Sequence, residues 1–418
     1  MKIARAARSP IGPAATLVAA AAVLLSGCAA SIGKNDLATS SVTPAPKQAA
    51  AIQEKQKPVK MAMLLPLGGF DASAAVAKAM KQAGEMALFE LDNPAIQLVV
   101  KDDRGTPEGA RAAAEEAIKD GAEVIIGPLF AKSVAGAASA ARPSNVPVIA
   151  FSNDKTVAGN GVYLMSFMAE AEVARVVSAA AAQGRKRFAA LIPEDAYGRV
   201  VEAAFRDAVA KSGASVAEIK TYPMNANGMI EPARAVVAAI KGAEATPAPI
   251  DALFVPGGPE TLPQIGPLIA LSGIDTAKVK LIGTGAWDFP NIGREQAFVG
   301  GWYASPDPRG WRDFSERFAK TFGSAPPRIA TLAYDAVQVA VSLSSNPPGT
   351  RYTTANLTRP IGFTGVDGPV RFTAQGMSER GLAVIEVQAF GTSVVDPAPA
   401  SFNMTKVSEA PAPAPRAN

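Results

Sequence analysis

The sequence predicts an α/β fold in which helices cover both faces of parallel sheets. The clearest evidence lies in residues 99–130, where an apolar run ends at Lys101, an Ala-rich segment without proline follows over 108–119, and a second apolar run ends at Gly127. Strand, crossover helix and strand in this order form the βαβ unit, whose two strands run in parallel. Parallel sheets are buried by helices and bind ligands at the carboxyl ends of their strands. The stretch therefore predicts both the fold class and the edge where a site would lie.

The first half of the chain continues this alternation of apolar runs and helical segments. Strands are expected over 59–67, 96–101, 124–126, 146–150 and 163–167, with helices over 72–93 and 108–119. Gly121 stands where the second of these helices would end, as glycine often does. The order predicts one sheet, which the chain leaves at residues 163–167.

A second series of strands and helices begins near residue 187 and predicts a second sheet. Strands over 187–192, 216–222, 252–255 and 279–282 alternate with helices over 199–212 and 231–241. Two such series need two hydrophobic cores. A chain of 418 residues that is 48% apolar is long enough to form them.

The composition argues against catalysis, cofactors and metal. The sequence contains no His, which removes Ser-His-Asp triads, Cys-His pairs and His-based metal sites. Acidic residues occur in pairs at 102–103 and 194–195, but adjacent side chains on an extended segment point to opposite sides and form no acid/base couple. We expect a protein that is not an enzyme and that uses no cofactor.

The N-terminus predicts a lipoprotein. Three basic residues precede an apolar run over 14–25, which is typical of a secretory signal and too short to span a bilayer of about 30 Å. The motif LSGC at 25–28 resembles the bacterial lipobox, in which the Cys is lipidated and becomes the first residue of the mature chain. The alternative is a free Cys28 after an ordinary signal peptide. Ala29 after the Cys favours the periplasm-facing side of the outer membrane over the inner membrane.

The predicted processing changes how the charge is interpreted. The sequence holds 41 basic and 37 acidic residues, and loss of a signal over 1–27 leaves 38 basic residues, a formal charge of +1. This near balance argues against nucleic acid as a partner. Residues 28–57 and 393–418 are rich in Ala, Pro and small polar residues, and predict a flexible tether and a disordered tail.

Several motifs in one order resemble a known family over residues 59–390. They are DDRGTPEGARAAAEEAIKDGAEVIIGPL at 102–129, DAYGR at 195–199, LAYDAV at 332–337 and FTGVDGPVRF at 363–372. Together they resemble the type I periplasmic substrate-binding proteins of the leucine/isoleucine/valine-binding group. The resemblance implies a two-lobed, hinged Venus-flytrap fold. The expected lobes are 58–168 with 287–342, and 169–286 with 343–392.

The resemblance also implies a ligand site between the lobes. In the amino-acid binders of this family, hydroxyls and backbone amides of lobe one hold the ligand carboxylate, and acidic and Tyr side chains of lobe two hold its ammonium. Tyr197 falls at the family's Tyr, whereas the family's Glu falls near Gly285, where Asp288 or Asp195 would substitute. The candidate wall consists of Phe130, Ser133, Ser152, Asn153, Tyr197 and Asp288.

This clamp is incomplete, and two interpretations stay open for its lobe-two members. The family's second lobe-two Tyr has no counterpart, because Pro-Gly-Gly-Pro at 256–259 replaces it. Tyr197 is alternatively a packed loop aromatic, and Asp288 a cap or turn residue.

Two functions follow from the resemblance. The first is capture of a small polar ligand, such as an amino acid, for an ABC permease. The alternative is an outer-membrane lipoprotein that activates a penicillin-binding protein during peptidoglycan synthesis, with a vestigial cleft. The incomplete clamp and the lipid anchor fit the second function, and an inner-membrane lipoprotein would fit the first.

Overall fold

The computed structural model describes residues 57–69 and 72–402 of the chain. The predicted signal at 1–27, the lipidation site Cys28 and almost all of the tether at 28–57 lie outside these described residues. Within them, no helix combines the length and the apolar character that a membrane crossing requires.

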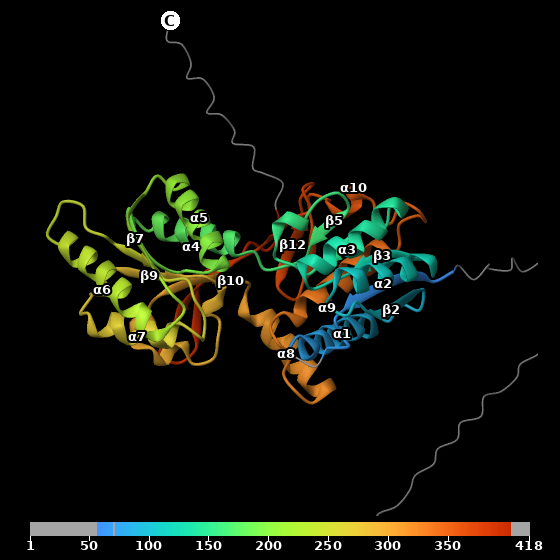
Figure 1. The fold of residues 1–418 in the computed structure, drawn as a ribbon, viewed down its shortest axis with the longest axis horizontal. Coiled ribbons are helices and arrows are strands. Elements are labelled where there is room, and N and C mark those ends of the chain that lie inside the picture. The colour runs from blue at the N-terminus through green and yellow to red at the C-terminus, as the bar shows by residue number, and fades with distance from the viewer. Residues whose placement is uncertain (1–56, 70–71, 403–418) are drawn as a thin grey trace, which may run out of the picture. The chain divides into compact units, whose positions relative to one another are not determined.

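The first sheet has five parallel strands in the order β2-β1-β3-β4-β5 (Figure 1). Its strands are β1 (Val59–Leu65), β2 (Ile96–Asp102), β3 (Ala122–Ile126), β4 (Val148–Ala150) and β5 (Val162–Leu164). The helices beside it are α1 (Ala72–Leu91), α2 (Pro107–Lys119), α3 (Ala131–Ala141), α8 (Pro308–Phe322), α9 (Ala330–Leu343) and the short α10 (Thr354–Leu357). The parallel α/β fold class is thereby confirmed.

Period-two alternation along the strands explains why both faces of this sheet are covered. In β1, Met61 and Met63 point into the core formed with α1, α8 and α9. Ala62 and Leu64, on the opposite face, pack against α2 and α3. From Met61 to Leu65 the strand is entirely apolar because neither face meets water there.

The second sheet has seven strands in the order β15-β14-β10-β9-β8-β6-β7. Its strands are β6 (Arg187–Pro193), β7 (Ser215–Tyr222), β8 (Ala252–Phe254), β9 (Lys280–Gly283), β10 (Trp302–Ser305), β14 (Ala383–Val387) and β15 (Thr392–Asp396). It is flanked by α4 (Ala169–Ala182), α5 (Ala196–Lys211), α6 (Ala226–Ala243) and α7 (Leu262–Leu271). The same alternation recurs in β6, where Phe188 faces α4 and α5 while Ala189 faces α6 and α7.

Smaller elements complete the chain. A third sheet of three antiparallel strands contains β11 (Phe363–Gly365), β12 (Gly368–Phe372) and β13 (Ser378–Arg380). The 3-10 helices are η1 (Arg142–Ser144), η2 (Lys155–Val157), η3 (Gly285–Trp287), η4 (Ile292–Arg294) and η5 (Gln296–Phe298). We call residues 58–164 and 308–380 the first lobe, and residues 169–305 and 383–396 the second lobe.

These lobes differ from the expected boundaries in two segments. Residues 287–305, expected in lobe one, belong to the second lobe because β10 pairs in parallel with β9 and Phe298 packs in the second core. Residues 343–380, expected in lobe two, belong to the first lobe because Phe363 and Phe372 pack in its core beside α9. Sequence motifs identified these segments without indicating which sheet each would join.

The predicted tail begins later than expected. Residues 392–396 form β15, which pairs antiparallel with β14, and Phe402 contacts Arg371 of the first lobe. The segment 393–402 is therefore part of the described fold. The rest of the predicted tail, 403–418, lies outside the described residues.

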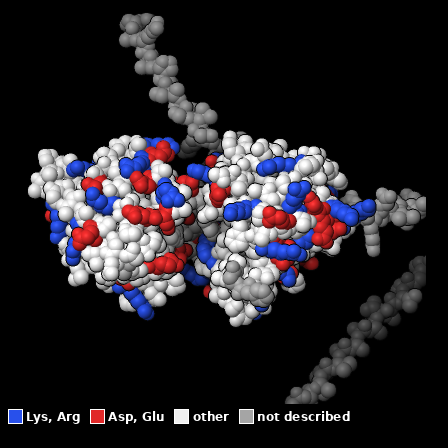
Figure 2. Space-filling view, viewed as in Figure 1, with Lys and Arg blue, Asp and Glu red and all other residues white. Residues whose placement is uncertain are grey.

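On the face shown in Figure 2, basic and acidic side chains of the described residues are interspersed. No extended area of that face carries basic side chains alone. This pattern agrees with the near balance of charges in the sequence.

Candidate functional site

The carboxyl ends of β3 and β4 form the first part of the candidate site. The backbone N–H of Phe151, after β4, donates to the carbonyl oxygen of Pro128, after β3, at 2.9 Å. This bond holds the loop at 127–133 beside the loop at 151–153. The structure thus brings together the four first-lobe members of the predicted wall, Phe130, Ser133, Ser152 and Asn153.

These four residues are not equally accessible. The side chains of Phe130 and Asn153 are exposed, that of Phe130 by 39%. Ser152 is buried, and its Oγ accepts the backbone N–H of Asp154 at 3.1 Å. Ser133 is completely buried in the first turn of α3, and its Oγ has no hydrogen-bond partner in the described part of the chain. Phe130 and Asn153 can therefore meet a ligand directly, whereas Ser152 shapes the loop.

The carboxyl ends of β6 and β9 form the second part of the site. Tyr197 lies in the first turn of α5, and its hydroxyl is 2.6 Å from the hydroxyl of Thr284 after β9. Burial raises the pKa of Tyr197, so its hydroxyl stays protonated. Asp195 is the N-cap of α5 and accepts the backbone N–H of Gly198 at 2.6 Å. Because Asp195 caps a helix, it is a poor substitute for the family's Glu.

A carboxylate that the sequence analysis missed lies next to this pair. Glu172, in the first turn of α4, is 9% exposed, and its Oε2 accepts the backbone N–H of Gly285 at 2.9 Å. A Cβ atom at position 285 would lie 2.9 Å from the Oε1 of Glu172, so this carboxylate fits only against a glycine. Burial raises the pKa of Glu172 to about 7, although the Gly285 N–H and Arg328 both favour the charged form.

Asp288 lies one turn beyond Gly285, at the end of η3. Its Oδ1 accepts the hydroxyl of Tyr303 at 3.4 Å, and its backbone N–H donates to the carbonyl of Gly285 at 3.0 Å. The side chain is exposed, yet desolvation by the surrounding protein raises its pKa. Asp288 is thus a carboxylate that water can reach although the surrounding protein disfavours its charge.

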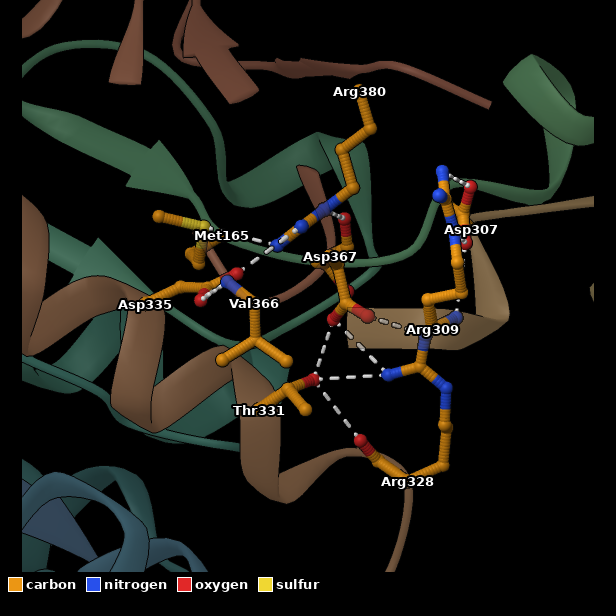
Figure 3. Close-up of polar contacts among 10 residues, drawn as sticks. Met165, Asp307, Arg309, Arg328, Thr331, Asp335, Val366, Asp367 and Arg380 are labelled. Atoms are coloured by element: carbon orange, nitrogen blue, oxygen red, sulfur yellow. Dashed lines mark hydrogen bonds and ion pairs between the residues drawn. The ribbon is translucent and has the colours of Figure 1, made fainter. Parts of the chain in front are cut away.

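One arginine of the first lobe lies close to both carboxylates. The charge of Arg328 lowers the pKa of Glu172 and of Asp288, against the larger effect of desolvation. Its guanidinium donates to the carboxylate of Asp367 at 2.5 and 3.0 Å and to Thr331 at 3.1 Å (Figure 3). Arg328 is therefore held in place from within the first lobe while its charge acts on the second.

A second arginine lies beside it. Arg380 contacts Asp335 at 3.4 Å (Figure 3). It also donates to the carbonyl of Ser166 at 3.2 Å, and both arginines stack on the ring of Phe167. Burial raises the pKa of Asp335 to about 7, against the charge of Arg380. Four carboxylates, those of Glu172, Asp288, Asp335 and Asp367, thus share two guanidinium groups. At neutral pH the raised pKa values leave Glu172 and Asp335 only partly charged, so the region carries little excess of negative charge.

A concavity of about 1030 Å³ lies elsewhere, at the amino ends of β3, β4 and β5. None of the predicted wall residues lines it. Its Arg351 is already paired with Glu123 at 2.7 Å. Ligands of open parallel sheets bind at the carboxyl ends of the strands, so we assign the candidate site to those ends.

No sequence pattern indicates the roles of Glu172 and Arg328. Glu172 is an ordinary acidic residue near a helix N-terminus, where such residues are common. Arg328 follows two prolines in a loop. Their placement depends on residues 113 and 39 positions away, which contact them only in the folded chain.

Comparison with known proteins agrees with this architecture. A family model described as "Periplasmic binding protein" matches residues 58–392. No curated protein sequence matches the chain.

Solved structures give a similar result. A protein described as a branched-chain amino acid ABC transporter from Rhodospirillum rubrum has a TM-score of 0.70 at 17% identity, covering 81% of this chain and 100% of that chain. The leucine binding protein LivK of Thermotoga maritima has a TM-score of 0.56 at 18% identity, with 83% and 99% covered. A solute binding protein of Rhodopseudomonas palustris in complex with 3,4-dihydroxy benzoic acid has a TM-score of 0.56 at 19% identity, with 82% and 99% covered. At these identities the likeness shows the fold alone.

Proposed function

The chain belongs to the family of periplasmic binding proteins, and from this premise we propose that it captures a small polar ligand for an ABC-type transporter. Ligand capture and delivery to a transporter form one proposal, because a binding protein of a transport system hands its bound ligand to the transporter. The bound molecule would contact the carboxyl-end loops of both lobes. We further propose that the protein acts by binding alone and is not an enzyme.

The observation that carries the proposal is the pair of carboxylates Glu172 and Asp288, whose pKa values are raised because burial disfavours their negative charge. A carboxylate whose pKa is raised by burial gains stability when a cation approaches it. An ammonium group placed between Glu172, Asp288 and the hydroxyl of Tyr197 would supply that cation. The exposed first-lobe groups, Phe130 and Asn153, would contact the rest of the ligand, while the buried Ser133 and Ser152 lie behind them in the same two loops. An amino acid has a suitable size and charge.

We also propose that the mature chain is anchored through a lipid on Cys28 and faces the periplasm, with the outer membrane favoured over the inner one. The tether at 28–57 would then separate the lipid from the first lobe. Mass spectrometry of the mature N-terminus measures this directly. A mature chain that begins at Ala29 without lipid would contradict it.

Titration calorimetry with a panel of amino acids, other small amines and aromatic acids tests the ligand proposal. We expect at least one amine-bearing compound to bind with a Kd on the order of micromolar, about −8 kcal/mol, and to raise the Tm by mass action. Glu172→Gln should weaken its binding by about 1.5–3 kcal/mol, since a hydrogen bond to a charged group is lost. Glu244→Gln, at an exposed site on the second lobe, is the matched control and should not change affinity.

A negative result across this panel would have a specific meaning. If no compound binds while a penicillin-binding protein co-purifies with the chain, the transport function fails and synthase activation replaces it. If aromatic acids bind and amines do not, ligand capture stands but the role of Glu172 and Asp288 fails.

A further inference from the structure

Four segments of the described chain pass between the two lobes. Residues 165–168, 306–307 and 381–382 each join a secondary-structure element of one lobe to an element of the other. The fourth segment, residues 397–402, leaves β15 at the edge of the second sheet and ends against the first lobe. Unlike the other three, it is followed by no helix or strand in the described chain.

The beginning of this fourth segment is fastened to the second lobe. The carboxylate of Asp396 pairs with Arg175 of α4 at 2.8 Å, and Arg175 also donates to the carbonyl of Leu382 at 2.9 Å. Ala398 packs against the second core. The segment therefore leaves the second lobe from a fixed point.

At its other end, Phe402 contacts the first lobe. The ring of Phe402 lies 4.7 Å from the guanidinium of Arg371 in β12 of the first lobe. The same ring is so close to Gly362 that a Cβ atom there would lie 3.2 Å from it. Arg371 is 34% exposed and also pairs with Glu379. A cation–π contact at such an exposed site changes an equilibrium by only about two- to fivefold.

The segment is also short. Phe402 lies four positions after Ala398, and four residues of extended chain reach at most about 14 Å. If a hinge movement increases the distance from Ala398 to Arg371 beyond the reach of these residues, Phe402 must leave Arg371. The contact is weak enough to break and strong enough to bias which lobe arrangement is populated.

We propose that residues 397–402 are a latch between the two lobes. While Phe402 contacts Arg371, the latch favours the lobe arrangement of this structure. It releases when the lobes move apart and the distance from Ala398 to Arg371 increases. The latch acts on the hinge and involves none of the candidate ligand-binding residues. It therefore does not depend on the identity of the ligand.

Distance measurements between spin labels on the two lobes test the latch. The full chain carries Cys28→Ser, and labelled cysteines replace the exposed Lys119 of α2 and Lys241 of α6. The measured quantity is the ratio of the lobe arrangement of this structure to an arrangement with the lobes further apart. Phe402→Ala should shift this ratio by about two- to fivefold, measured by double electron–electron resonance without ligand. Phe390→Ala is the matched control, because Phe390 is 98% exposed in the turn between β14 and β15.

A double-mutant cycle separates the latch from local damage. Arg371→Gln should produce the same shift as Phe402→Ala, and the double variant should add little to either. Each of these three variants removes the same contact, between Phe402 and Arg371. The latch is disproved if the distance distribution of Phe402→Ala matches that of the unsubstituted chain. It is equally disproved if Phe390→Ala produces the same shift, or if the two latch substitutions add independently.

Discussion

The two lobes share one architecture, yet their binding edges differ in chemistry. Each lobe has a sheet of mainly parallel strands between two layers of helices, with β14 of the second sheet antiparallel to its neighbours, and we assign the candidate site to the carboxyl ends of the parallel strands. The first-lobe edge offers neutral groups: the ring of Phe130, the amide of Asn153 and two serine hydroxyls. The second-lobe edge offers the carboxylates of Glu172 and Asp288 beside Tyr197.

This difference shows how a repeated topology can orient a ligand. The backbone places loops at equivalent edges of both sheets, whereas the side chains in those loops decide which end of a ligand each lobe prefers. Arg328 connects the two edges, because it is fixed by Asp367 in the first lobe and its charge acts on carboxylates of the second. Substitutions at one edge, or at Arg328, therefore test the contribution of each separately.

The largest effect is expected from Arg328→Met, which breaks the connection. Asp367 is completely buried, and removal of its partner leaves an uncompensated charge. The free energy of unfolding should fall by about 3–5 kcal/mol, measured by urea denaturation. Arg309→Gln is the control, since the Arg309 side chain is 81% exposed and water screens its pair with Asp307, so its loss should change stability far less. Equal losses in both variants would contradict the role of burial.

The second prediction concerns pH and the second-lobe edge. The pKa of Glu172 is raised from 4.5 to about 7, so the folded state binds the proton more tightly than the unfolded state does. Stability from this group is therefore greatest below pH 4.5 and falls as pH rises towards 7, by about 1.4 kcal/mol per pH unit.

Denaturation of Glu172→Gln between pH 4.5 and 7 measures this contribution. The variant should lose that part of the slope and keep the part from Asp335, whose pKa is raised in the same direction. An unchanged slope would mean that Glu172 is not desolvated. The affinity for an amine should rise with pH through about 7 in the unsubstituted protein, because the charged carboxylate is the form that binds a cation.

The third prediction compares the two edges directly. Asp288→Ala should weaken binding of an amine-bearing ligand by about 1–3 kcal/mol, because a hydrogen bond to a charged group is lost. Asn153→Ala removes a neutral amide from the first-lobe edge and should cost about 0.5–1.5 kcal/mol. Calorimetry of both variants with one ligand gives the ratio. A larger loss for Asn153→Ala would reverse the proposed assignment of the charged end of the ligand.

The smallest effect is expected from Ser133→Ala. The hydroxyl of Ser133 is buried without a partner among the described residues, so its removal should leave stability unchanged or raise it by about 1 kcal/mol. If this hydroxyl receives the ligand, affinity should fall while stability does not. Thermal unfolding with and without ligand separates the two, and a clear loss of stability in the free protein would show that the hydroxyl has a structural partner.

Much of the fold could be predicted because it depends on local patterns. Apolar runs bounded by turn residues located strands β1 to β4 and β6 to β9, and the order of strands and helices indicated parallel sheets. Helix α7 escaped prediction because its sequence, LPQIGPLIAL, contains two prolines and a glycine. Segments that come after the chain has already built parts of both lobes, such as 287–305, were assigned to the wrong sheet. The pattern of a strand does not identify the strand beside which it will pair.

By itself, the sequence determined the fold class, the edge of each sheet where a site would lie, and the absence of His-based chemistry. All three follow from residue type and spacing along the chain. The tertiary structure alone decided that Glu172 rests on Gly285, that Arg328 is held by Asp367 beside these carboxylates, and that Phe402 reaches Arg371. Each of these pairs joins residues that are distant in the sequence, and the desolvation that changes their pKa values exists only once the cores have packed.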